Sequence, residues 1–187
     1  MPRTLANARV SIDRFIFEAE ECARQKLGFA AMSTIFPVIL SVSEAVVGKH
    51  IGTLTRHDDK NLFENFVPRM VDKDWLISRS STVFSNKDIA TDLSQIRDGL
   101  AHQMSLPNHV GMINTKSEAK EFLKANPTTS RIISVEEFIK AVQATIDVMV
   151  KNYPDAALDP NPRGTSRSLA TRVVLPSGAS GSPASRK

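Results

Sequence analysis

One short run of residues, Arg97-Asp98-Gly99-Leu100-Ala101-His102, carries three side chains that could do chemistry. Asp98 and His102 are four residues apart, which on a helix places a carboxylate beside an imidazole on one face. A neighbouring carboxylate favours the charged imidazolium and fixes the orientation of the ring. Arg97 is about 140° of helical rotation away from His102, at about 100° per residue. These residues are therefore candidates for acid–base chemistry, although one helix cannot easily aim Arg97 and His102 at the same group.

The same residues also have a simpler interpretation, because an Asp–His pair at helical spacing is common on exposed helix faces. Two details favour a functional role. Gly99 in a helix interior costs about 1 kcal/mol relative to alanine, which predicts close approach by another helix or a ligand. His102 stands where the helical pattern ends, and the terminal carbonyls there favour its protonated form.

The helix that must position these residues is the clearest in the sequence. Ser85-Asn86-Lys87-Asp88 has the form of a capping box that begins it, with Asp in place of the commoner Glu. Apolar residues then recur at offsets of four, seven and eleven and predict a single buried stripe: Ile89, Leu93, Ile96 and Leu100. If this stripe packs into the core, Asp98 and His102 point outward. The pattern fades after His102.

Further helices are predicted on both sides of this one. Their expected ranges are Leu5 to Leu27, Phe29 to Gly48, Asn61 to Val71, Ser117 to Ala125, and a last helix from the capping box Ser134-Val135-Glu136-Glu137 to Pro154. The second range is apolar nearly all round, and Pro37 either kinks it or marks its beginning. Polar residues interrupt it, which indicates a buried core helix rather than a membrane span.

The connections are less regular than the helices. Residues 72–84 are ambiguous, although Trp75 is expected to reach the core. Val110 to Ile113 and Arg131 to Val135 could pair as a small hairpin. The predicted fold class is all-α, a four- to five-helix bundle over residues 1–154. Residues 155–187 are rich in Pro, Ser, Gly and Arg and are predicted to form a disordered basic tail.

The charge of the chain is unevenly placed. The net charge is +4 over 187 residues, with 24 basic and 20 acidic side chains. Residues 160–187 hold five of the basic residues and no acid, which leaves 19 basic against 20 acidic residues in the rest, a net charge of −1. Net basicity is therefore poor evidence that the folded part binds a polyanion.

Composition also limits the compartment and the chemistry. The single cysteine, Cys22, excludes an internal disulfide and a cysteine zinc cage, and it fits a reducing compartment. The N-terminus lacks the pattern of a secretory signal, so a cytoplasmic protein is expected. No cofactor or metal is predicted, since His50, His57, Asp58 and Asp59 lack the spacing of a helical ligand pair. His109 is interpreted as a turn residue.

The run from Ile96 to His102 resembles the signature of the HEPN superfamily, which is an arginine, a polar residue, spacers and a histidine on a late helix of a bundle. The segment from Lys26 to Met32, which leads into a long apolar helix, is also similar to many HEPN-like proteins. The resemblance covers roughly residues 5–153, but only the Arg97-to-His102 hexamer matches a motif.

The resemblance implies metal-independent RNA cleavage at a homodimer interface, where two copies of the motif face each other. His102 would act as general base or acid around the ribose 2′-hydroxyl. Arg97 would stabilise the charge that develops on the phosphate. Asp98 would orient His102. Asn is common at that place in the family, so the acid at position 98 is a departure that adds negative charge near the phosphate and is expected to reduce activity.

The resemblance further implies a toxin or phage-defence component with an RNA substrate, and with an antitoxin or another partner protein. Two alternatives remain open at this stage. The first is a non-catalytic helical module that uses the same helix face to bind a partner protein or a second copy. The second is an RNA-binding protein that does not cleave, whose salt-dependent affinity would weaken without residues 160–187.

Overall fold

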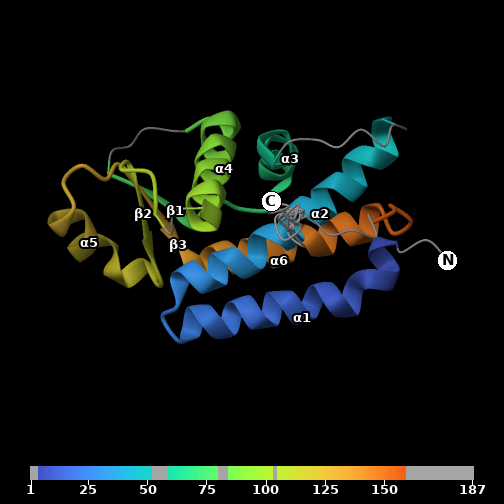
Figure 1. Ribbon diagram of the computed structural model, residues 1–187, viewed down its shortest axis with the longest axis horizontal. Helices are drawn as coiled ribbons and strands as arrows, with labels where there is room; N and C mark the ends of the chain where they lie inside the picture. Colours follow the sequence, from blue (N-terminus) through green and yellow to red (C-terminus); the bar gives the residue numbers. More distant parts are fainter. Residues whose placement is uncertain (1–3, 52–58, 80–83, 103–104, 159–187) are drawn as a thin grey trace, which may run out of the picture.

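A computed structural model describes residues 4–51, 59–79, 84–102 and 105–158 of the chain (Figure 1). The described part is mostly helical, with helices α1 Leu5–Arg24, α2 Gly28–Ile51, α3 Asp59–Phe66, α4 Asn86–His102, α5 Ala119–Ala125 and α6 Val135–Asn152. It also contains strands β1 Leu76–Ser78, β2 Val110–Ile113 and β3 Arg131–Ser134. The predicted mostly helical bundle is therefore confirmed, although the described residues form six helices rather than four or five and add a small three-stranded sheet.

Helix α2 is the centre of the bundle. It packs against α1, α3, α4 and α6, and its residues Ile35, Ile39 and Val42 are completely buried. Pro37 lies inside the helix rather than at its beginning. The stretch Gly28–Val47 is long and apolar enough to cross a membrane by composition, but 67% of its most apolar window is buried inside the protein. Burial of this extent fits a helix that packs in the core of the bundle.

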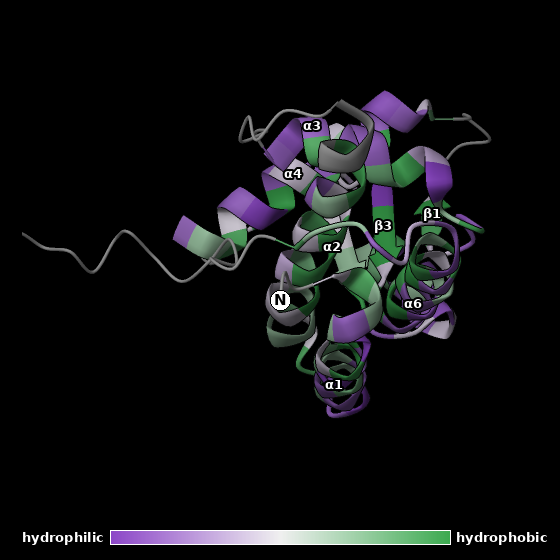
Figure 2. Ribbon diagram, turned by 90° about the vertical axis from the view of Figure 1, so that its right-hand side faces the viewer, coloured by the Kyte–Doolittle hydropathy of each residue, from purple (hydrophilic) through white to green (hydrophobic). Residues whose placement is uncertain are grey.

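Helices α1, α2 and α6 pack against one another, with α1 at the bottom in Figure 1. Helices α3 and α4 lie side by side on the opposite side of α2 from α1, and the sheet and α5 lie at one end. Figure 2 shows hydrophobic residues along β3, which runs into the interior beside α6. Trp75 is fully buried there, as expected, and its ring packs edge-on against Phe138 with centroids 4.8 Å apart.

The strands form one small sheet in the order β1-β3-β2. Strand β3 is antiparallel to β1 but parallel to β2, with Val110 opposite Arg131. The expected hairpin is therefore wrong in direction, although the two predicted segments do pair. Parallel strands need a crossover connection, and the segment between β2 and β3 provides one, because it contains the turn Lys116–Glu118 and helix α5.

The two predicted capping boxes have different outcomes. At the start of α4, the Asp88 carboxylate accepts the Ser85 backbone N–H at 3.1 Å, and the Ser85 hydroxyl accepts the Asp88 N–H at 3.2 Å. At the start of α6, Ser134 makes no capping hydrogen bond. Its side chain is completely buried at the end of β3, and its backbone N–H donates to the Trp75 carbonyl at 2.9 Å. The second box is therefore not formed, because pairing in the sheet fixes Ser134 instead.

The chain returns to its own beginning after α6. The Leu5 backbone N–H donates to the Ala156 carbonyl at 3.0 Å, and the Ala6 N–H donates to the Pro154 carbonyl at 3.0 Å. Ala156 is buried. The described residues end at Leu158, so the rest of the predicted basic tail, residues 159–187, lies outside them.

Candidate functional site

Helix α4 fixes the direction of each candidate side chain. All four residues of the predicted stripe, from Ile89 to Leu100, are buried, with at most 5% of their surface exposed. The stripe holds the helix against α2 and α3. Asp98 and His102 therefore face outward, as predicted, and both are exposed.

Arg97 reaches sideways from α4 to the first turn of α3. Its Nε lies 3.0 Å from Oδ2 of Asp59, and its Nη1 lies 2.9 Å from Oδ1 of Asp98. The side chain is 29% exposed. Because a guanidinium has about five N–H donors, these two contacts hold Arg97 in place and leave donors for an external group. Sequence reasoning missed Asp59, because nothing local links it to a residue on another helix.

The structure does not bring Arg97 and His102 together within one copy. Asp98 and His102 line a solvent-open hollow of about 360 Å³, and Arg97 is not among its lining residues. The Asp98 carboxylate is bound to Arg97 rather than to the imidazole. Within the described ranges, His102 has no hydrogen-bond or ion-pair partner, so its ring is available to a ligand or to a second copy.

Gly99 forms the floor of this α4 hollow. A Cβ atom added at Gly99 would lie 2.3 Å from the backbone oxygen of Ser105, so no larger residue fits without a shift. The Ser105 N–H also donates to the Gly99 carbonyl at 3.3 Å. The predicted close approach to Gly99 is confirmed, but it does not come from another helix or a ligand. It comes from residues 105–109, which follow α4 and which we call the return segment. Ser105, Leu106 and Pro107 form the wall of the hollow.

A second arginine, aspartate and histidine meet at Asp92, six residues before Asp98 on the helix. The side chain of Asp92 is only 8% exposed, and its Oδ1 lies 3.1 Å from Nε2 of His109. Its Oδ2 forms an ion pair with Nη1 of Arg131 on β3. The guanidinium of Arg131 lies over the ring of Phe84, 4.1 Å from its centroid. We call Asp92, His109 and Arg131 the Asp92 set, and Arg97, Asp98 and His102 the Asp98 set.

The Asp92 set anchors the wall of the α4 hollow. At the beginning of the return segment, the Ser105 backbone N–H donates to the Gly99 carbonyl. At its end, the His109 imidazole is hydrogen-bonded to the Asp92 carboxylate. Sequence reasoning missed this set, although its interpretation of His109 as a turn residue is confirmed, since Asn108 and His109 form a turn directly before β2. A signal was present, because Asp92 falls beside the apolar stripe at helical spacing from Ile89, and a buried carboxylate requires a cationic partner.

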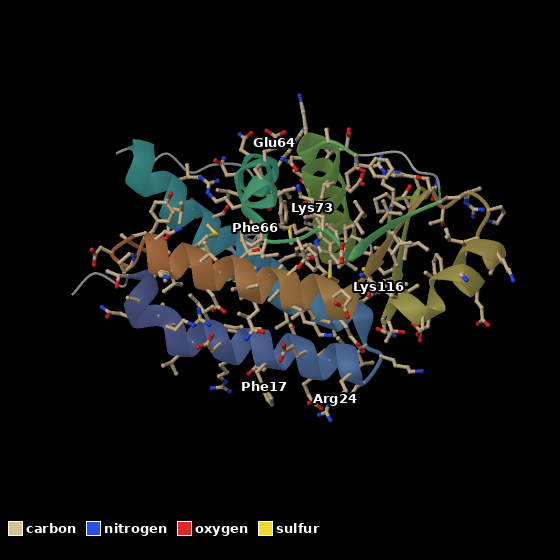
Figure 3. All side chains as sticks on the ribbon, turned by 180° about the vertical axis from the view of Figure 1, so that it is seen from behind. Phe17, Arg24, Glu64, Phe66, Lys73 and Lys116 are labelled. Carbon is tan, nitrogen blue, oxygen red and sulfur yellow. The ribbon has the colours of Figure 1, made fainter. Side chains whose placement is uncertain are left out.

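The molecule has a larger hollow far from these residues. It measures about 820 Å³ and lies between the α1–α2 turn, β2 and α5, with Leu27 and Phe29 exposed at its rim. Helix α1 also presents exposed apolar side chains, Val10 and Phe17, and Figure 3 shows Phe17 pointing away from the bundle. The larger hollow is lined mainly by apolar side chains, together with the charged residues Lys26, Glu118 and Glu121.

Within the described part of the chain, no three His, Cys, Asp or Glu side chains are grouped closely enough to hold a metal ion. His57 and Asp58 lie outside the described residues, as does the side chain of His50. Neither family models, nor curated proteins, nor solved structures match this chain.

Proposed function

We propose that this chain is a metal-independent endoribonuclease of HEPN type that acts as a homodimer. The observation that carries the proposal is the exposed end of α4, where an unpartnered His102 imidazole borders an open hollow and Arg97 is held in place by two carboxylates. Arginine, aspartate and histidine occupy the motif positions there, and the helical bundle supplies the context that the resemblance requires.

The active site would be composite. Within one copy, Arg97 is held on the α3 side of the helix, whereas His102 borders the hollow on the other side of Asp98. A two-fold axis that brings two α4 helices together would place Arg97 of one copy beside His102 of the other. Each dimer would then hold two equivalent sites.

The chemistry uses groups of the chain alone. His102 removes the proton from the ribose 2′-hydroxyl, and the 2′-oxygen attacks the adjacent phosphorus. Arg97 stabilises the negative charge that develops on the phosphate oxygens. The bond from phosphorus to the 5′-oxygen breaks, and that oxygen takes a proton from an imidazolium. The products are a 2′,3′-cyclic phosphate and a free 5′-hydroxyl.

The test is cleavage of a structured RNA in EDTA by the wild type and by His102→Ala and Arg97→Ala variants. The proposal expects cleavage by the wild type, loss of at least about a hundredfold in each variant, and no effect of the chelator. Arg14→Ala is a matched control, because Arg14 also pairs with a carboxylate on an exposed helix face, that of Glu18 at 3.0 Å. Equal cleavage by wild type and His102→Ala, or loss of cleavage in EDTA, would contradict the mechanism.

A cytoplasmic enzyme of this kind would act as a toxin or phage-defence component, controlled by an antitoxin or another partner protein. Induced expression would then arrest growth, and the His102→Ala variant would not.

The second candidate is a non-catalytic helical module that binds a partner protein, RNA or another copy. The exposed apolar residues of α1 and the rim of the larger hollow favour it, because such positions commonly mark protein contacts. It predicts a wild type that binds but never cleaves RNA, and binding that is lost on Phe17→Asp rather than on His102→Ala.

A further inference from the structure

The α4 hollow lies directly beside His102 and has the size of a small-molecule site. Its volume of about 360 Å³ falls within the range of about 300–1,000 Å³ typical of ligand pockets. Gln95, Asp98 and Ser105 contribute polar groups, and Leu106 and Pro107 contribute an apolar wall. A planar polar group packed against that wall would reach the polar groups with its edge.

The charge of the lining shows what kind of group fits. Asp98 lines the hollow, and no lysine or arginine does so among the described residues. A phosphate placed there would face a carboxylate. A neutral heterocycle with hydrogen-bond donors would instead be attracted to it.

From this arrangement we infer that the α4 hollow is a nucleobase subsite that selects bases carrying an exocyclic amino group. The inference rests on the proposed ribonuclease function, because the ribose next to His102 would direct its base into the adjacent hollow.

The selectivity follows from the hydrogen bonds that Asp98 has left. Its Oδ1 accepts from Arg97 at 2.9 Å, which leaves Oδ2 to accept from a further donor. An amino group of adenine, cytosine or guanine supplies such a donor, and the Gln95 amide can bond a neighbouring edge atom. Uracil has no amino group, and its N3–H donor lies between two carbonyl oxygens that the carboxylate would repel.

Two contacts anchor the wall of the hollow. Ser105 rests on Gly99, where the backbones are in contact, and His109 is bound to the buried carboxylate of Asp92. Leu106 and Pro107 lie between these two anchors. A base packed against them would present its edge to Gln95 and Asp98 in a fixed position.

The experiment measures cleavage of four RNAs that differ only in the base attached to the ribose that attacks. The wild type is expected to cut the adenine, cytosine and guanine substrates about tenfold faster than the uracil substrate. Asp98→Asn is the decisive variant, because its amide donates where the carboxylate only accepts. It is expected to raise the ratio of uracil to adenine cleavage, and this ratio is the readout because the substitution also alters the contact of residue 98 with Arg97 and so the overall rate.

A second measurement does not depend on cleavage. The Gly99 amide and the Gln95 side-chain amide are followed by NMR while adenosine or uridine monophosphate is added to the full chain. Shifts that are larger with the adenosine nucleotide support the subsite. No shift with either nucleotide overturns it, as do shifts that follow only protein concentration, because a second copy then fills the hollow.

The two failures can be told apart. Cleavage that depends on His102 but ignores the base, in both wild type and Asp98→Asn, overturns the subsite and leaves the ribonuclease standing. Absence of cleavage overturns the proposed function, and the nucleotide titration then decides the subsite alone.

Discussion

Helix α4 carries two sets of the same three residue types, and the structure uses them differently. In the Asp98 set, the central carboxylate is 57% exposed and the three residues lie within six positions of the sequence. In the Asp92 set, the central carboxylate is 8% exposed and its partners come from β3 and from the residue before β2. Both oxygens of Asp92 are bound within the chain, whereas among the described residues Asp98 is bound only through Oδ1.

The difference indicates that the two sets on α4 have different roles. A buried carboxylate is stable only if it is paired and hydrogen-bonded, so the contacts of Asp92 with Arg131 and His109 tie α4 to the sheet and the return segment. An exposed set adds little to stability because water screens its charges. Its histidine is left available for a ligand. The same chemistry is therefore structural at one end of α4 and is proposed to be functional at the other.

The largest expected effect separates the two aspartates. Asp92→Ala would leave the Arg131 charge buried without its partner, and we expect it to lower the free energy of unfolding by about 3–5 kcal/mol. Asp98→Ala should change it by less than about 0.5 kcal/mol, as is usual for exposed sites. Urea unfolding of the two variants measures both values. Similar losses in the two variants would remove the distinction between the sets.

A smaller effect is expected at the floor of the α4 hollow. Gly99→Ala improves helix propensity by about 1 kcal/mol, but its Cβ would meet the Ser105 carbonyl oxygen. Overpacking of this kind costs about 1–3 kcal/mol, so the variant should be less stable than the wild type or no more stable. Ala101→Gly, on the exposed side of the same turn, is the control. Its change in the free energy of unfolding measures the difference in helix propensity between alanine and glycine without the Ser105 contact. If Gly99→Ala instead raises the free energy of unfolding by the full helix-propensity difference of about 1 kcal/mol, the contact between residue 99 and the Ser105 carbonyl oxygen does not constrain the helix.

The smallest effect concerns the start of the helix that both sets share. Hydrogen bonds from the Ser85 hydroxyl and backbone N–H lower the pKa of Asp88 below its ordinary value. A lowered pKa means that the cap stabilises the fold above the ordinary aspartate pKa of about 3.9. That contribution is lost as the pH falls through the lower folded value. The melting-temperature difference between wild type and Asp88→Asn should therefore be present at neutral pH and shrink in acid. A difference that grows in acid would have the wrong sign.

Local features of α4 could be predicted from the sequence, and features made by distant segments could not. The apolar stripe, the Ser85 cap and the outward direction of Asp98 and His102 follow from spacing along one helix. The pairing of Arg97 with Asp59 depends on how α3 packs against α4, and no periodicity encodes that.

The sheet shows the same limit. The apolar runs that became β2 and β3 were visible in the sequence, but their parallel direction depends on the path of the intervening chain. Ser134 had the sequence of a capping residue, yet pairing with distant segments buried it. The contacts of Asp92 with distant residues differ from these cases, because they could have been expected from the local sequence. Asp92 lies beside the apolar stripe, and a carboxylate buried there needs a cationic partner.

The composite active site is tested most directly by mixing two inactive variants. Arg97→Ala and His102→Ala proteins are each expected to lack cleavage as homodimers. Mixed dimers would contain one site with an intact arginine from one copy and an intact histidine from the other. If the subunits exchange freely, activity should recover to roughly a quarter of the wild-type value, since about half of the dimers are mixed and each has one of its two sites restored. No recovery, with mixed dimers confirmed by native mass spectrometry, would contradict a site shared between two copies.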